Sequence, residues 1–430
     1  MKALVVGYGV TGQAVERHLL AAGWHVVVVD DRATGERVVT APEPGTLRAL
    51  VADADLVVPS PGVPFAHPVY GLAAQSGVPV LSEIELAFRE LQGLPLVAVT
   101  GTNGKTTVTT LIAAMLHRGG ISAVAAGNIG LPLIDAVGRA EVVVAEVSSF
   151  QLRYTEEFRP DVAVWLNLSE DHLDWHPDVA DYAAAKAKVW ANQRPGDVAV
   201  VNAEDPAVMA AARTAPGRVV TFGVGAGGDA DWRVADGWLT SPEGRQVAAV
   251  ADLPRALPHD LANDLAALAA VAPFGIPDAD CRAVLAEFEG LPHRVQLVSD
   301  AGGVRWYDDS KATTPASVVA ALQGFPSVVL IAGGRNKGLD MGVLRHAAGP
   351  VRAVVAIGDA AAEVAAAFGG LVPVTVAHSM DEAVDAAARA ARPGDAVLLS
   401  PGCASFDWYG SYAERGDDFV RAVNERVGAR

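Results

Sequence analysis

The segment VAVTGTNGKTTV, residues 97–108, constrains the fold of this chain more than any other stretch. An apolar strand at 96–100 leads into a turn with two glycines, and Lys105 and Thr106 then open a helical pattern. This order is typical of a phosphate-binding loop, in which backbone N–H groups surround a phosphate chain. Lys105 would neutralise the β- and γ-phosphates, and the Thr106 hydroxyl would ligate Mg²⁺. Position 99 is Val where a strict Walker A motif has glycine, so an ordinary glycine-rich turn is the alternative.

A second glycine motif, VVGYGVTGQAV at residues 5–15, follows the first apolar run of the chain. Gly7, Gly9 and Gly12 predict a strand, a tight turn and a helix N-terminus that can hold a pyrophosphate. Asp30 ends the next apolar run, about where a ribose-binding acid of a dinucleotide site would lie. Taken alone, these residues favour a nicotinamide dinucleotide no more than another diphosphate.

Composition excludes several classes of protein. The chain has 430 residues, too many for one ordinary core, and its 51% hydrophobic and 19% charged residues are typical of globular domains. A formal charge of −17 argues against a nucleic-acid partner, although small anions remain possible ligands. The two cysteines, Cys281 and Cys403, predict no disulfide framework and fit a reducing compartment. The initial apolar run is too short for a signal peptide, and no run is long enough for a membrane span. We therefore expect a cytoplasmic protein without a membrane partner. A monomer is a further expectation, which composition does not establish.

Short apolar runs alternate with helical patterns along the whole chain, which predicts parallel sheets covered by helices. The segment QGLPL at 92–96 is interpreted as a linker, and GLPHR at 290–294 marks a second boundary. We predict three consecutive α/β domains at 1–92, 93–291 and 292–430. The expected strands are at 2–6, 25–30, 55–58, 78–81, 96–100, 142–147, 162–167, 198–201, 328–332, 353–357 and 396–400, with helices near 260–272 and 278–288 and a β-hairpin region within 223–256.

Polar residues follow several of the central strands. Glu146 ends the run VVVAE, and a carboxylate at the end of a buried strand is costly unless it is paired or binds a metal. After the next strand, the segment NLSEDHLD places His172 among acidic residues. Lys186 lies in the Ala-rich helical segment YAAAKAK. The alternatives are an acid closing an ordinary strand, a structural histidine and a lysine on a solvated helix face.

The last third of the chain adds four clusters: LPHRVQ, DDSKATTP, IAGGRNKG and LLSPGCASFDWYGSY. Three of them follow apolar strands and carry Gly, Ser, Thr or Lys. Each cluster alone could be a polar turn.

The order GTNGKTT, EVSSFQL, LNLSEDHLD, YAAAK, HR, DDSKAT, GGRNKG and SPGCASFD resembles that of the Mur ligases over nearly the whole chain. The N-terminal glycine motif, SSFQL, DSKAT and SPxxASxD are similar to the member of this family that adds D-glutamate. The resemblance implies a Rossmann-like N-terminal domain, a P-loop-type central ATPase domain and a Rossmann-like C-terminal domain. It also implies that the N-terminal domain holds a UDP group rather than a redox cofactor.

The activity that the resemblance implies is ATP-dependent amide formation. The substrates would be UDP-N-acetylmuramoyl-L-alanine, D-glutamate and ATP, and an acyl phosphate would give the carboxylate a leaving group. Two Mg²⁺ ions would assist, and Lys186 would carry a carbamate derived from CO₂, which adds only to the neutral amine.

Roles carried over from the family fall into four groups. The catalytic residues would be Lys105, Glu146, His172 and Lys186, and the metal ligands Thr106, Glu146, His172 and the carbamate of Lys186. ATP would bind Gly101, Thr102, Asn103, Gly104, Lys105, Thr106, Thr107, Asn263, Arg294 and Asp309. The UDP substrate would bind Val10, Thr11, Asp30, Asp31, Arg32, Gly62, Asn128 and His172, and D-glutamate would bind Lys311, Thr313, Lys337, Ser405 and Tyr412.

The chain departs from the family pattern at four places. His259-Asp260 stands where His-Asn is usual, Arg335 adds a charge, Tyr412 replaces a common Phe, and Trp175 stands where Arg often follows HxD. The competing functions are another Mur or folylpolyglutamate-type ligase, an NAD-dependent oxidoreductase and a non-catalytic nucleotide-binding scaffold.

Overall fold

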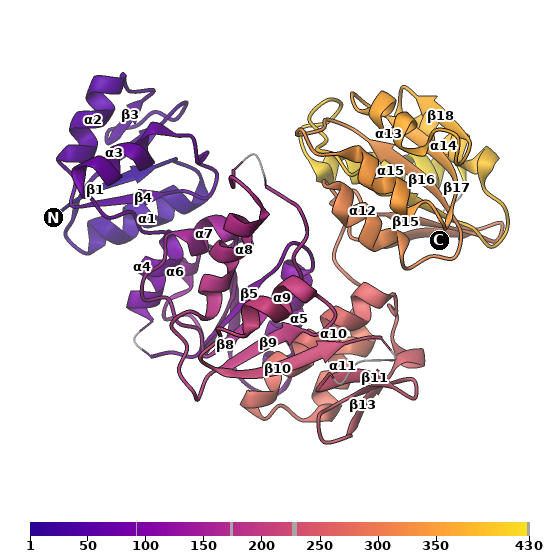
Figure 1. Cartoon of the computed structure of the whole chain (residues 1–430), viewed down its shortest axis with the longest axis horizontal. Coiled ribbons are helices and arrows are strands. Elements are labelled where there is room, and N and C mark those ends of the chain that lie inside the picture. Colours follow the sequence, from indigo (N-terminus) through magenta and orange to yellow (C-terminus); the bar gives the residue numbers. More distant parts are fainter. Residues whose placement is uncertain (92, 173–174, 226–229, 428–430) are drawn as a thin grey trace. The chain divides into compact units, whose positions relative to one another are not determined.

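The computed structural model describes residues 1–91, 93–172, 175–225 and 230–427, so Gln92 at the first predicted boundary lies outside the described residues. The chain forms two compact units. The first comprises Met1–Leu168, Trp175–Leu253 and Ala262–Glu287, and the second comprises Ser169–Asp174, Pro254–Leu261 and Phe288–Arg430. The first unit holds two sheets and the second holds one, which confirms the predicted α/β class (Figure 1).

The N-terminal sheet has four parallel strands in the order β3-β2-β1-β4. Its strands are nearly continuous apolar runs, as expected for a parallel sheet covered on both faces. Its elements are β1 (Lys2–Val6), α1 (Val10–Ala21), β2 (His25–Asp30), β3 (Val38–Thr40), α2 (Pro44–Ala52), β4 (Leu56–Pro59), α3 (Pro68–Ser76) and α4 (Glu83–Glu90).

The predicted strand at 78–81 is wrong. Only Val80 pairs, in an isolated bridge with Val57. Pro79 has no N–H to donate, and α4 begins at Glu83, so the segment is too short and too poor in donors to extend the sheet.

The central sheet has nine strands in the order β13-β12-β11-β10-β9-β8-β5-β7-β6. Strands β5 to β11 are parallel, whereas β11, β12 and β13 form an antiparallel extension, which confirms the predicted hairpin region. Its elements are β5 (Leu96–Thr100), α5 (Lys105–Arg118), β6 (Ala123–Gly127), α6 (Leu133–Ala136), β7 (Val142–Glu146), α7 (Ser149–Arg153), β8 (Val162–Trp165), α8 (Val179–Ala187), η1 (Lys188–Trp190), β9 (Val198–Asn202), α9 (Pro206–Ala212), β10 (Arg218–Gly223), β11 (Trp232–Ala235), β12 (Trp238–Thr240), β13 (Gln246–Ala249), η2 (Val250–Asp252), α10 (Pro258–Val271), η3 (Ala272–Phe274) and α11 (Asp278–Glu287).

A shared apolar core joins the two sheets of the first unit. Helix α4 packs on α6, and Ile84 and Leu133 lie in one buried cluster with residues of both sheets. At the edge of this contact, Arg17 on α1 forms an ion pair with Asp135 on α6. The N-terminal sheet is therefore fixed to the central sheet by packing.

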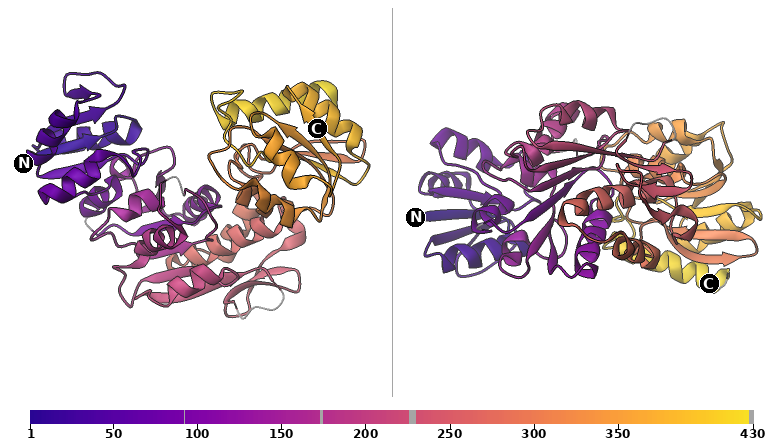
Figure 2. Two further views of the ribbon diagram at one scale, coloured as in Figure 1. Left: turned by 45° about the horizontal axis from the view of Figure 1, so that its top comes forward. Right: turned by 90° about the horizontal axis from the view of Figure 1, so that it is seen from below.

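The C-terminal sheet has the order β14-β15-β19-β16-β17-β18, and only β14 is antiparallel to its neighbour. Separate apolar clusters cover its two faces. Helices lie on both sides of the sheet in the views of Figures 1 and 2. Its elements are β14 (Gln296–Ala301), β15 (Val304–Asp308), α12 (Pro315–Leu322), β16 (Val328–Gly333), η4 (Met341–Ala347), β17 (Val351–Ile357), α13 (Ala361–Phe368), β18 (Val374–Ala377), α14 (Met380–Ala390), β19 (Ala396–Leu399) and α15 (Tyr412–Arg426). Among the described residues of the chain, no helix is both long and apolar enough to cross a bilayer.

The N-terminal glycine turn depends on close backbone contact. Gly7 has a positive φ of 88°, and a Cβ atom at Gly12 would lie 2.0 Å from the carbonyl oxygen of Gly7. Only glycine at position 12 lets α1 approach the end of β1 this closely.

We predict that Gly12→Ala lowers the free energy of unfolding by about 1–3 kcal/mol, because the added methyl must push backbone apart. Urea unfolding of the purified protein measures this. Gly9→Ala is the matched control on the same turn: a Cβ there meets nothing within 4 Å, so we expect a change below about 1 kcal/mol. Equal stability of the two variants would contradict this account of the turn.

Candidate functional site

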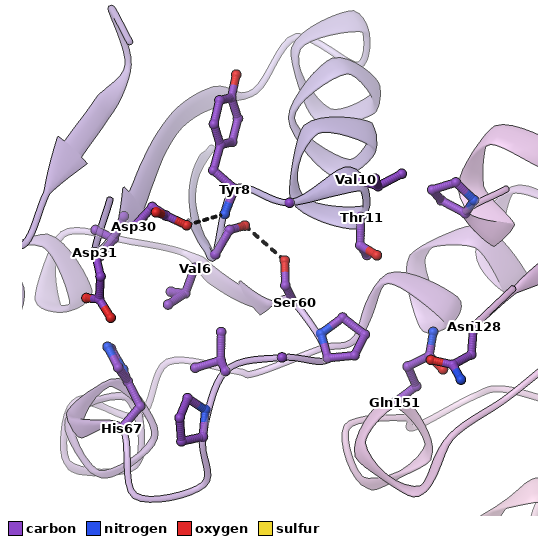
Figure 3. Close-up of a pocket in the computed structure, with 18 of the residues that line it drawn as sticks. Val6, Tyr8, Val10, Thr11, Asp30, Asp31, Ser60, His67, Asn128 and Gln151 are labelled. Carbon is purple, nitrogen blue, oxygen red and sulfur yellow. Dashed lines mark hydrogen bonds between the residues drawn. The ribbon is translucent and has the colours of Figure 1, made fainter. Parts of the chain in front are cut away.

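A cavity of about 660 Å³ lies in the first unit, at the carboxyl ends of β1, β2 and β4. Its far wall comes from the central sheet, through residues after β6 and from α7 (Figure 3). Seven of the eight residues predicted for UDP binding line it: Val10, Thr11, Asp30, Asp31, Arg32, Gly62 and Asn128. The eighth, His172, belongs to the second unit.

Asp30 organises the cavity wall. One carboxylate oxygen accepts the backbone N–H of Tyr8 at 2.7 Å, and the other accepts those of Arg32 and Ala33 at 2.8 and 2.7 Å. These three donors hold the pKa of Asp30 below its usual value, against the opposing effect of burial. The carboxylate thus joins the glycine turn after β1 to the turn after β2.

Four lining residues with polar side chains were not predicted: Tyr8, Ser60, His67 and Gln151. Ser60 directly follows β4, so the strand-end rule could have found it. Gln151 belongs to a capping box in which its side-chain oxygen accepts the N–H of Ser148 at 3.0 Å, and SSFQ carries that signature in the sequence. His67 points toward Asp31 (Figure 3), an arrangement with no local sequence signal.

The predicted phosphate loop, residues 101–107, connects β5 to α5. Gly104 has a φ of 85°, and a Cβ there would lie 2.5 Å from Oδ1 of Asn263, which brings that predicted ATP ligand to the loop. Lys105 Nζ donates to the carbonyl oxygens of Gly101 and Thr102 at 2.9 and 2.8 Å. The loop therefore presents a lysine at the N-terminus of a 14-residue helix, a suitable place for phosphate.

Glu146 lies beside this loop at the end of β7 and is only 3% exposed. Its Oε2 accepts the hydroxyl of Thr106 at 2.7 Å, and its Oε1 accepts the side-chain amide of Asn128 at 2.9 Å. Both donors are neutral groups, and they place a buried carboxyl group beside a hydroxyl. Carboxylate and hydroxyl oxygens suit Mg²⁺. Among the residues described, no group of three or more His, Cys, Asp or Glu side chains forms a protein-only metal site.

Lys186 on α8 is buried, with 1% of its surface exposed, so the solvated-face alternative is wrong. Its Nζ donates to the carbonyl of Gly101 at 2.9 Å and lies 4.6 Å from the centre of the Tyr182 ring. Lys105 and Lys186 thus meet at one carbonyl of the phosphate loop.

A buried network fixes α8 against α7. His176 is fully buried, and its ring nitrogens lie 2.7 Å from Asp181 Oδ2 and 2.9 Å from Ser149 Oγ. Burial lowers the pKa of His176, although the hydrogen bond that its ring makes to the Asp181 carboxylate acts in the opposite direction. Trp175 lies beside His176 and is one of the four departures from the family pattern. Its Nε1 donates to the carbonyl of Val63 at 3.0 Å, so the side chain contacts the N-terminal region.

The second unit carries the remaining predicted residues. His172 has a φ of 56° and its backbone N–H donates to Asp171 at 2.8 Å; its roles in binding a metal ion and the UDP substrate stay predictions. Residues predicted for D-glutamate follow three neighbouring strands: Lys311 and Thr313 after β15, Lys337 after β16, and Ser405 and Tyr412 after β19.

The Lys311 ammonium lies 3.9 Å from the centre of the Tyr412 ring, so this departure from Phe keeps an aromatic face against the lysine. Arg335 pairs with Asp359 at 3.5 Å, which offsets its added charge. Ser405 is buried, whereas Lys337 is exposed.

Asp309 is buried, and this burial raises its pKa to about 7. Its Oδ2 accepts the Ser400 hydroxyl at 2.7 Å, and its Oδ1 accepts the N–H of Val295 at 3.3 Å. It therefore lies next to the turn that carries Arg294, its predicted partner in ATP binding.

Three family patterns match the chain: the MurD-like N-terminal domain of Mur ligases over 1–82, the Mur ligase middle domain over 99–271, and the Mur ligase glutamate ligase domain over 293–403. A protein of Frankia casuarinae is 46% identical over 448 aligned residues, which cover 99% of this chain and 94% of the relative. The chain belongs to the Mur ligase family.

The Frankia protein is named UDP-N-acetylmuramoylalanine--D-glutamate ligase. A relative of the same name from Anaeromyxobacter dehalogenans is 42% identical, with 98% of this chain and 97% of the relative covered. Among solved structures, UDP-N-acetylmuramate-alanine ligase MurC from Thermotoga maritima has a TM-score of 0.62 and 21% identity, with 99% of both chains covered. The MurF ligase from Thermotoga maritima in complex with ADP has a TM-score of 0.59 and 18% identity, covering 99% of this chain and 95% of that one. These structures show the shared fold.

We predict that Asp30→Asn makes the stability of the protein less sensitive to acid. Because the folded-state pKa of Asp30 is lowered, its carboxylate stabilises the fold above its unfolded pKa, and this contribution is lost as pH falls through the folded value. The unfolding free energy of the wild type should therefore fall more steeply below pH 5 than that of Asp30→Asn, measured by urea titration from pH 3 to 7. Asp31→Asn removes the same charge one residue along the chain and serves as the control. If the unfolding free energies of the two variants depend on pH in the same way, the three N–H hydrogen bonds to Asp30 do not cause the effect.

Proposed function

We propose that this protein is an ATP-dependent ligase that joins D-glutamate to UDP-N-acetylmuramoyl-L-alanine through an acyl phosphate, in the synthesis of a peptidoglycan precursor. The observation that supports this most is the position of Asn128. Its side chain lines the N-terminal cavity and donates to Glu146, which in turn accepts from Thr106 of the phosphate loop. One amide thus connects a cavity suited to a diphosphate with a loop suited to ATP.

The proposed roles follow the geometry of the first unit. The cavity takes the UDP group, with the diphosphate at the N-terminus of α1, so the sugar and its alanyl carboxylate extend toward Asn128. Lys105 and the loop residues Gly101, Thr102, Asn103, Gly104, Thr106 and Thr107 bind the ATP phosphates, with Asn263, Arg294 and Asp309 completing the nucleotide site. We further propose that the domains are bounded at 1–92, 93–291 and 292–430 and that the protein acts as a cytoplasmic monomer.

Thr106 and Glu146 would hold Mg²⁺, and His172 and a carbamate on Lys186 would hold a second ion. Bound there, Mg²⁺ supplies positive charge that offsets the repulsion between the alanyl carboxylate and the γ-phosphate. This chain's own cations, Lys105 foremost, add to that charge.

The reaction needs activation because a free carboxylate is a poor acyl donor. Attack of the alanyl carboxylate on the γ-phosphate of ATP releases ADP, and the amine of D-glutamate then displaces phosphate to form the amide. Lys311, Thr313, Lys337, Ser405 and Tyr412 would bind D-glutamate, whose two carboxylates require cations and hydroxyl donors.

A phosphate-release assay with ATP, UDP-N-acetylmuramoyl-L-alanine and one amino acid at a time tests the proposal. We expect release with D-glutamate and little with L-lysine or meso-diaminopimelate; the reverse preference would indicate another ligase of the family. Lys105→Ala should lose at least about 100-fold in rate, because it removes the charge that faces the phosphates. Full activity of that variant, or binding of NADH in place of the UDP substrate, would overturn the proposal.

We predict that Lys186→Ala abolishes activity and that short-chain carboxylates restore part of it, since they can supply the anion that the carbamate provides. The same assay, with and without acetate or propionate, measures this. Lys188→Ala is the matched control two residues along; that ammonium donates to the carbonyls of Arg153 and Thr155 at 2.7 and 3.1 Å. Full activity of Lys186→Ala in CO₂-free buffer would exclude a carbamate.

A further inference from the structure

The backbone on both sides of Arg294 is strained. His293 has a φ of 60° and Val295 a φ of 47°, in the left-handed region that side chains disfavour. The conformation is least expected for Val295, whose side chain branches at Cβ. Strain of this kind persists only where surrounding contacts enforce it, and it concentrates at functional sites. The contacts that enforce it here are therefore of interest.

Contacts on the His293 side come from the C-terminal sheet. The His293 ring lies 2.6 Å from Asp308 Oδ2, a hydrogen bond that raises the pKa of the imidazole. The backbone N–H of His293 donates to Gln296 at 3.1 Å, and its carbonyl accepts the N–H of Lys311 at 3.1 Å. These residues belong to the motifs already assigned to the site.

Contacts on the Val295 side include one that no motif contains. The N–H of Val295 donates to Asp309, and its carbonyl accepts Nη1 of Arg255 at 2.9 Å. The guanidinium of Arg255 lies against Gly290, where a Cβ would come 3.0 Å from Nη1. Arg255 thus reaches from the segment before α10 to the strained turn.

Asp260 holds Arg255 in this place. Its Oδ1 accepts from Nη2 and Nε of Arg255 at 2.8 and 3.1 Å, and its Oδ2 accepts the N–H of Leu257 at 3.3 Å. The two side chains are 16% and 8% exposed, so solvent screens the pair little. A neutral side chain at position 260 would not balance the charge of Arg255.

We infer that Arg255, held by Asp260, is a positioning residue that keeps the turn at 293–295 in the conformation that presents Arg294 to the nucleotide. All of these residues lie in the second compact unit. The inference rests on the proposed ATP-binding role of Arg294. It adds to the site a pair of residues that lies outside the assigned motifs.

The test compares Arg255→Met, which keeps the aliphatic stem, with Asp260→Ala and the double variant. Calorimetric titration with a non-hydrolysable ATP analogue measures nucleotide affinity, and steady-state kinetics give KM for ATP and for the UDP substrate. We expect Arg255→Met to bind the analogue about tenfold to 100-fold more weakly, with KM for the UDP substrate unchanged, because a displaced positioning group costs this much. The double variant should be no weaker than Arg255→Met, since Asp260 acts through Arg255.

Amide hydrogen exchange and urea unfolding separate positioning from a general loss of stability. Exchange should accelerate at residues 293–296 of Arg255→Met and not elsewhere in the C-terminal sheet. Arg421→Met is the matched control: that arginine pairs with Asp418 and Glu425 on the exposed face of α15, and its loss should leave analogue affinity unchanged. If Arg255→Met does not fold, Asp260→Asn, which keeps the shape of the side chain, serves as the second variant and should weaken binding in the same direction.

Analogue affinity within about twofold of the wild type in both Arg255→Met and Asp260→Asn would overturn the inference, given the normal scatter of independent sites. The inference would also be overturned if KM rose equally for ATP and for the UDP substrate and the free energy of unfolding fell at the same time. A wild type that binds the analogue but ligates no amino acid would instead refute the proposed function and leave the positioning role standing.

Discussion

The carboxyl ends of parallel strands lie on the same side of their sheet, and the position of the candidate site residues in this molecule depends on this constraint. Each buried apolar run leaves its last backbone groups at that edge, where loops with polar side chains satisfy them. Asp30 ends β2, Glu146 ends β7, and Asp308 ends β15. The chemistry of the chain is therefore concentrated at the carboxyl ends of three sheets, and the opposite edges carry none of the assigned residues.

Burial at these edges is tolerated because the carboxylates are well supplied with donors. Asp30 accepts three backbone N–H groups, whereas Glu146 accepts a hydroxyl and a side-chain amide. The first arrangement builds a rigid wall, and the second suits a cation that arrives with a substrate. The difference in donors, rather than in residue type, distinguishes a structural carboxylate from a candidate ligand.

Patterns of short range were predictable from the sequence, and contacts of long range were not. The strands, the glycine turns and the cavity residues from Val10 to Gly62 follow from apolar runs and strand ends, because both are local. The burial of Lys186 is not visible in its Ala-rich helix, since it arises from packing of α8 against α7 and from the contact of Lys186 with the phosphate loop. Arg255 and Asp260 are five residues apart, but the carbonyl that they serve is 40 residues from Arg255 along the chain. The prediction of a strand at 78–81 was wrong because it relied on the local apolar pattern and gave too little weight to Pro79, which has no N–H to donate.

Helix α10 has a consequence for dividing the protein into fragments. Its first residues, through Leu261, belong to the second compact unit, and the helix continues from Ala262 in the first. A C-terminal fragment that begins at residue 292 would contain Val295 without the arginine that caps its carbonyl, and would leave Arg255 and Asp260 behind on the other piece. Proteolysis or separate expression at that apparent linker would thus yield a lobe whose turn at 293–295 is free to relax, even if its sheet stays intact.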